Sequence, residues 1–133
     1  MYVIFRDDMI SSDDIIKKIN SETLFKVETN LTKATKREDV MSFKLSIPVD
    51  SIGAKDEFYW ENNDSVEMYF KSAEELTKDI LKFFPKYTIQ ASRAYKWDEI
   101  ENKILLVVVI SNIDLKLKKL ELDILKRMMK QVD

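Results

Sequence analysis

Apolar positions along most of this chain recur either at every second residue, as in a strand, or at helical spacing, but one block follows neither pattern. Seven consecutive apolar residues run from Ile104 to Ile110 within "KILLVVVISN". The loss of alternation predicts a central strand over 103–112 that is covered on both faces. Either the chain's own helices or a second subunit must cover its second face. Shorter apolar or alternating blocks predict the other strands, at 1–5, 24–31, 40–49 and 87–97.

Helical spacing occurs in three segments. Ser72 and Glu75 form a capping box, and Pro85 ends the apolar pattern that follows. These signals predict a middle helix over 72–84. The same kind of spacing predicts an N-terminal helix within 11–20 and a C-terminal helix over 113–130.

The order of these elements indicates the fold class. Residues 55–70 contain turn-forming Asn and Asp at 62–64, followed by alternating apolar positions, so we predict a second hairpin there. Helix, three or four strands, helix, two strands and helix then follow one another. This order predicts a single α+β domain, 1–133, whose antiparallel sheet of about five to six strands is packed by helices.

The composition excludes several kinds of chemistry. The 133 residues include no Cys and no His, which excludes disulfides, thiolate or imidazole ligands and a Ser-His-Asp triad on this chain. Gly53 is the only glycine, so a phosphate-binding loop and a dinucleotide-binding fingerprint are excluded as well. Any catalysis would fall to carboxylates, Lys, Tyr, Arg or a metal held by oxygen ligands. We favour a protein with no metal, no cofactor and no enzymatic activity.

Charge and hydropathy constrain the partner only weakly. The formal net charge is −2, so the composition predicts neither a strongly basic nucleic-acid-binding protein nor a strongly acidic one. The first nine residues lack the basic region of a signal peptide. The apolar run at 104–110 is far shorter than the roughly 18–20 residues that span a bilayer. We expect a cytoplasmic protein that does not contact a membrane.

Two alternative functions depend on charged residues. Glu101 and Lys103 form an E-x-K triplet, which Mg²⁺-dependent nucleases use to hold the metal and activate water, although a polar turn explains them better. Basic residues of the C-terminal helix could bind nucleic-acid phosphates, although the solvated face of an amphipathic helix explains them better. Those residues are Lys116, Lys119, Lys126, Arg127 and Lys130.

We favour a non-enzymatic protein-binding or assembly protein, of the small chaperone, adaptor or immunity type. Arginine beside exposed aromatic rings is the mixture enriched in protein-binding hot spots. Large rings also occur close together in the predicted hairpins. The candidate protein-binding residues are Tyr59, Trp60, Arg93, Tyr95 and Trp97.

The C-terminal helix predicts a homodimer. Its apolar arc covers more than half of the circumference, which is more than one packing surface needs. The alternative is a helix that lies deep in a groove of its own monomer. The residues expected at the dimer interface are Leu115, Leu122, Leu125 and Met129.

The order helix–β–β–β–helix–β–β–helix resembles that of the class I chaperones of type III secretion. The segments that carry the resemblance are "SSDDIIKKIN", "SFKLSIPV", "SAEELTKDILKFF", "KILLVVVI" and the last helix. Those chaperones are small homodimeric α+β proteins that bind an unfolded segment of a secreted effector. The resemblance implies a homodimer with a protein partner and assigns no site residue. Small phage tail-completion proteins share much of this order.

Overall fold

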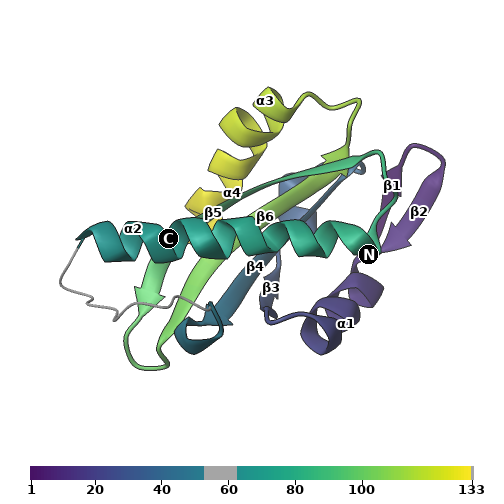
Figure 1. The fold of residues 1–133 in the computed structure, drawn as a ribbon. Helices are drawn as coiled ribbons and strands as arrows, with labels where there is room; N and C mark the ends of the chain where they lie inside the picture. Colours follow the sequence, from purple (N-terminus) through teal and green to yellow (C-terminus); the bar gives the residue numbers. More distant parts are fainter. Residues whose placement is uncertain (53–62, 133) are drawn as a thin grey trace.

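A four-stranded antiparallel sheet with the strand order β3-β4-β6-β5 organises the fold (Figure 1). The computed structural model describes residues 1–52 and 63–132. The predicted α+β class, with N-terminal, middle and C-terminal helices, is confirmed. The strands of this sheet are β3 (Lys26–Asn30), β4 (Val40–Pro48), β5 (Thr88–Asp98) and β6 (Lys103–Asn112).

An N-terminal hairpin and a helix precede the sheet. Strand β1 (Tyr2–Phe5) pairs with β2 (Asp8–Ser11), and helix α1 (Ser12–Glu22) follows directly. The predicted N-terminal strand and helix are confirmed. Strand β2 is not predicted by the apolar pattern, because Asp8 and Ser11 make half of its four residues polar.

The middle helix begins before its predicted capping signal. Helix α2 (Asn63–Leu76) continues directly into the 3-10 helix η3 (Thr77–Phe83). The helical segment predicted over 72–84 is therefore confirmed, and Pro85 follows its end. Ser72 lies inside α2 rather than at an N-cap, so the capping-box interpretation is wrong.

The second hairpin predicted over 55–70 is wrong for residues 63–70, which are helical. Tyr69 and Ala73, four positions apart, are buried in the core, so packing of one helical face decides the structure here. Apolar residues at every second position are compatible with a helix, because only those on one helical face have to be buried. The rest of that predicted hairpin falls on 53–62, outside the described residues.

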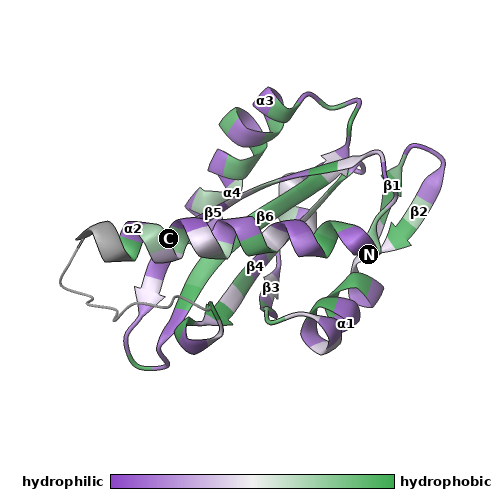
Figure 2. Cartoon of the chain, viewed as in Figure 1, coloured by the Kyte–Doolittle hydropathy of each residue, from purple (hydrophilic) through white to green (hydrophobic). Residues whose placement is uncertain are grey.

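One face of the sheet packs against α1, α2, η3 and the N-terminal hairpin (Figure 1). Figure 2 shows hydrophobic strands in the middle of the fold and helices that carry hydrophilic residues among their apolar ones. Burial of each large apolar side chain contributes about 1.5–3 kcal/mol, so this cluster is the main core. Its fully buried residues from β4 and β6 are Met41, Phe43, Leu45, Ile47, Ile104, Leu106, Val108 and Ile110.

The C-terminal helix covers the other face. It consists of α3 (Leu117–Lys119), a π-helical segment η4 (Leu120–Leu125) and α4 (Lys126–Val132), without a break. Val107 and Val109 of β6 belong to this second cluster, so the predicted burial of β6 on both faces is confirmed. The chain's own helix covers them. The helix residues buried in this cluster are Leu120, Ile124, Leu125 and Met128.

The π-helical segment explains the unusually wide apolar arc. In a regular α-helix, successive side chains point about 100° apart, since there are 3.6 residues per turn. Ile124 and Leu125 are adjacent, yet they are only 0% and 4% exposed. A π-helix accommodates one extra residue in a turn, which lets both side chains face the same surface. Leu120, Ile124, Leu125 and Met128 of this arc therefore pack within the monomer, whereas Leu122 stays exposed.

At each edge of the sheet, a backbone N–H group donates a hydrogen bond to a polar side chain of the same chain. On β3, the Val27 N–H donates to Asn20 Oδ1 at 2.8 Å. On β5, the Ala94 N–H donates to Glu74 Oε1 at 2.9 Å. Edge donors that are already paired are not available to a strand from another molecule, so these contacts limit edge-to-edge association.

Leu125 and Leu122 test the packing of the C-terminal helix. We expect Leu125→Ala to lower the free energy of unfolding by about 3 kcal/mol, because it leaves a cavity against the sheet. Leu122→Ala is the matched control, since Leu122 is 54% exposed, and it should change stability by less than about 0.5 kcal/mol. Urea unfolding followed by circular dichroism measures both. Equal effects of the two substitutions would contradict this packing.

Candidate functional site

A groove of about 650 Å³ runs along one side of α2, at the border of the main core. Two rows of side chains from α2 and η3 line it, because residues four apart share one face of a helix. Ile52, just after the 3-10 turn η2 (Val49–Ser51), lines it as well. The rows are Met68, Ser72 and Leu76, and Glu67, Lys71, Glu75 and Asp79.

The groove continues towards the end of α1. Leu76 and Asp79 also line a neighbouring hollow of about 340 Å³, whose other side is formed by residues 21–25. Leu24 in that segment is 57% exposed. The two hollows share residues, so they form one depression, which we call the α2 groove.

The α2 groove combines apolar side chains with an acidic rim. Met68 and Leu24 are exposed apolar residues of its lining. Four carboxylates and two ammonium groups surround them, and Lys78 also pairs with Glu75 at 3.0 Å, so the formal charge of the rim is −1 with Lys78 included. These charged residues are Glu22, Glu67, Glu75, Asp79, Lys71 and Lys82. Such a surface can bury apolar side chains of a ligand and attract cationic groups beside them.

The predicted aromatic site does not assemble on one surface of the described residues. Tyr59 and Trp60 lie outside the described residues, and Arg93 is exposed on β5. A β-bulge near the end of β5 shifts the alternation. As a result, Tyr95 packs against the cluster under the C-terminal helix, whereas Trp97 packs against the main core on the opposite face.

The four residues expected at a dimer interface occupy different environments. Leu125 is buried in the chain's own core, so it is not available to a second subunit in this fold. Leu115 and Met129 are half-buried against the same cluster. Leu122 is exposed. These residues therefore do not form a continuous exposed seam.

Glu101 and Lys103 belong to a larger ion-pair cluster. The Lys103 ammonium lies 3.1 Å from Glu28 Oε1 and also contacts the Glu101 carboxylate. Ser46 Oγ donates to Glu28 Oε1 at 2.6 Å. The hydrogen bond from Ser46, together with that from Lys103, lowers the pKa of Glu28. The hydrogen bond to Glu101 raises the pKa of Lys103 despite its partial burial.

This cluster fits a structural role better than a hydrolytic one. A lysine whose pKa is raised stays protonated and cannot accept a proton from water. Glu28 and Glu101 both direct carboxylate oxygens at the ammonium group. Across residues 1–52 and 63–132, no three or more acidic side chains converge in a way that could hold a metal ion. The cluster instead ties β3, β4 and β6 together.

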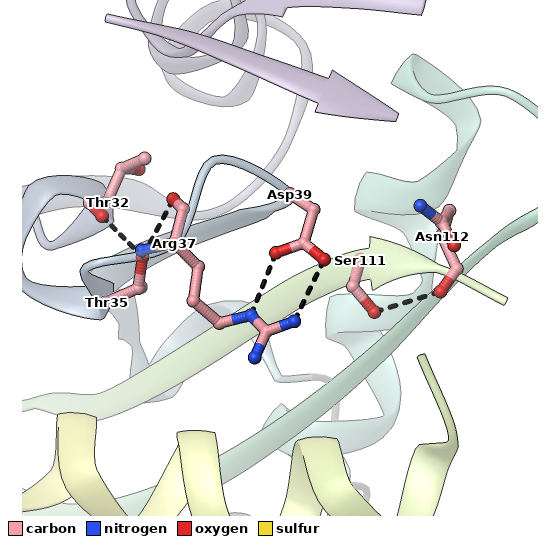
Figure 3. Close-up of polar contacts among 6 residues, drawn as sticks. All are labelled: Thr32, Thr35, Arg37, Asp39, Ser111 and Asn112. Atoms are coloured by element: carbon pink, nitrogen blue, oxygen red, sulfur yellow. Dashed lines mark hydrogen bonds and ion pairs between the residues drawn. The ribbon is translucent and has the colours of Figure 1, made fainter. Parts of the chain in front are cut away.

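A second cleft, of about 490 Å³, lies where β4 begins and β6 ends, and Arg6 and Arg37 line it. Arg37 Nε and Nη2 donate to the Asp39 carboxylate at 2.8 and 3.0 Å (Figure 3). This pairing raises the pKa of Arg37 and lowers that of Asp39. Arg6 makes a similar bidentate contact with Asp114, at 3.0 Å for both bonds. Both guanidinium groups are already paired with carboxylates, so the cleft is less suited to binding an anion than to holding neighbouring segments of the chain together.

The contacts of Arg6 also hold the N-terminal hairpin in place. Arg6 lies in its two-residue turn with φ 56°, a left-handed conformation that such turns require. Its guanidinium carbon is 4.7 Å from the centroid of the Tyr87 ring. The Tyr87 hydroxyl donates to the Phe5 carbonyl at 2.9 Å and to the Asp8 carboxylate. The hydrogen bond to Asp8 raises the pKa of Tyr87 to about 12.

The sequence contains a signal for the α2 groove, but a competing pattern hides it. Met68, Ser72 and Leu76 recur at helical spacing. Met68 also alternates with Val66 and Phe70, which predicts a strand. Extending the middle helix towards its N-terminus would have placed the groove residues on one face.

No family model, curated protein or solved structure matches this chain. The resemblance to class I secretion chaperones therefore stays a prediction from element order. No helix among the described residues is long and apolar enough to cross a membrane. The geometry and chemistry of its surface are therefore what bear on the function of this chain.

Glu28→Gln tests the ion-pair cluster. At pH 7 we expect the variant to be less stable than the wild type by about 1 kcal/mol, because the Lys103 ammonium loses a charged partner. The pKa of Glu28 is lowered on folding, so this advantage exists above its usual value of 4.5 and is lost as the pH falls through the folded value. Urea unfolding between pH 7 and about pH 3 measures the difference.

The exposed Glu99, in the turn after β5, supplies the matched control. Glu99→Gln should change stability by less than about 0.5 kcal/mol at either pH. A Glu28→Gln deficit that stays constant as the pH falls would show that the carboxylate charge does not stabilise the fold.

Proposed function

We propose that this chain is a non-enzymatic protein-binding module that holds an amphipathic, cationic segment of a protein in its α2 groove. The observation that carries this proposal is a groove with exposed Met68 and half-buried Leu76 inside an acidic rim. Exposed apolar surface bordered by polar residues is typical of protein-interaction sites. Small chaperones, adaptors and immunity-type proteins all act through a surface of this kind.

A helix is the ligand that best matches the groove. An amphipathic helix places apolar residues three or four positions apart into such a groove, and its flanking charges meet the rim. Burial of two leucine side chains contributes about 3–6 kcal/mol before the cost of association is subtracted. We therefore expect binding in the micromolar range or weaker, which suits an adaptor that must release its partner.

A designed peptide tests this function directly. The probe is a synthetic helix with leucines on one face and lysines on both flanks, and fluorescence anisotropy measures its binding. We expect Met68→Lys to weaken binding by about tenfold or more, because it removes apolar surface and adds a like charge. Ile100→Lys is the matched control, since Ile100 is 96% exposed in the β5–β6 turn, and it should leave binding unchanged.

A second peptide separates apolar burial from charge. It keeps the leucine face and replaces every lysine by glutamate, so the acidic rim should repel it. We expect it to bind at least about tenfold more weakly than the cationic peptide at low salt. Equal binding of both peptides, or cationic-peptide binding that Met68→Lys does not change, would show that the α2 groove is not the site.

A further inference from the structure

The outward side of the C-terminal helix carries an exposed leucine among basic residues. Lys118, Leu122 and Lys126 are exposed and four positions apart, so they lie in one row. Lys119 and Lys130 are exposed as well. We call these five residues the basic ridge.

Charge is divided unequally between this helix and the rest of the chain. Residues 116–132 contain six basic and two acidic side chains, a formal charge of +4. The whole chain carries −2, so the remaining residues carry −6. The α2 groove, with its acidic rim, lies on the side of the sheet opposite to the basic ridge. The protein is therefore near neutral overall, but it has one surface where apolar and acidic side chains lie together and another where an apolar side chain lies among basic ones.

We propose that the basic ridge of a second copy of this chain occupies the α2 groove. This inference rests on the proposed function and names the partner of the same site. The ridge is itself an amphipathic, cationic helix face, which is the ligand that the groove chemistry requires. Leu122 supplies the apolar group, and the lysines on either side of it supply the positive charges.

The spacing of the two surfaces also matches. Glu67 and Glu75 are eight residues apart on α2, which corresponds to about 12 Å along a helix. Lys118 and Lys126 are also eight residues apart, and Leu122 lies midway between them. With the two helices side by side, both lysines can reach carboxylates. Leu122 then lies opposite Lys71 and Ser72, between the apolar side chains of Met68 and Leu76.

The placement of the two surfaces determines the symmetry of the assembly. Helix α2, which carries the groove, packs on one face of the sheet, and the C-terminal helix, which carries the ridge, packs on the other face. Figure 1 shows the positions of these helices. A contact between two different surfaces of the same kind of molecule is heterologous. When two copies bind in this way, one of them keeps a free groove and the other keeps a free ridge. The copies therefore associate head to tail in an open series rather than as a closed homodimer.

A nucleic acid is a less suitable ligand for the ridge. Leu122 occupies the middle of the basic row, where phosphate binding would favour a polar or basic side chain. Asp123 lies next to it and pairs with Arg127 at 3.2 Å, so the Arg127 guanidinium is already engaged and is less available to a phosphate. Nucleic-acid binding by this helix is an outcome that the experiment below can detect.

Sedimentation velocity of the full-length chain and two surface variants tests the inference. Glu67→Lys with Glu75→Lys blocks the groove, and Lys118→Glu with Lys126→Glu blocks the ridge; all four side chains are exposed, and circular dichroism checks the fold. The wild type should form a series of oligomers that grows with concentration up to about 100 µM and shrinks in about 0.5 M salt. Each variant alone should stay monomeric.

Mixing the two variants gives the decisive result. The groove-blocked copy keeps its ridge and the ridge-blocked copy keeps its groove, so the mixture should stop at one-to-one dimers. A monomeric wild type, or a wild-type dimer that one set of substitutions leaves intact, overturns the inference. So does a ridge that binds a DNA duplex at low salt without any self-association. If the cationic peptide still binds the groove in those cases, the proposed function stands and only the second copy is excluded.

Discussion

The whole fold depends on burying β6 from both sides. A strand with seven consecutive apolar residues cannot lie at an edge or face water, so it lies between β4 and β5. One layer of helices must then cover Ile104, Leu106, Val108 and Ile110, and another must cover Val107 and Val109. The first requirement fixes α1 and α2 on one side, and the second fixes the C-terminal helix on the other. Both proposed interaction surfaces are the outer sides of these covering helices.

This arrangement also separates charge. A helix that covers a sheet presents its hydrophilic side to solvent, and the two layers present different charges. The acidic groove and the basic ridge thus belong to opposite layers of one sheet, while the Lys103 and Arg37 ion pairs neutralise charge near the strand ends. Net charge conceals this division, because the contributions of the layers nearly cancel. A molecule with such a charge dipole orients in the field of a similar molecule before contact.

Local patterns predict much of the fold, whereas the candidate site depends on contacts between distant segments. The run at 104–110 is sufficient to predict a central strand, because no exposed position could hold it. The start of α2 is not predictable from alternation, since Met68 satisfies both a strand and a helix pattern. The π-helical turn at Ile124 and Leu125 has no sequence signature, so the burial of both residues is not predictable from helical spacing. The groove needs Ile52, Leu24 and α2 together, and only the folded chain combines them.

The side chains at the sheet edges restrict the direction in which copies of this protein can be added. With the N–H groups of Val27 and Ala94 already bonded to Asn20 and Glu74, hydrogen-bonded extension of the sheet meets occupied donors. The association proposed above runs perpendicular to the sheet, through side chains rather than backbone. An array built in that direction is reversible and sensitive to ionic strength, because no continuous backbone ladder passes from one molecule to the next. The edge contacts thus disfavour backbone pairing between copies at these two positions.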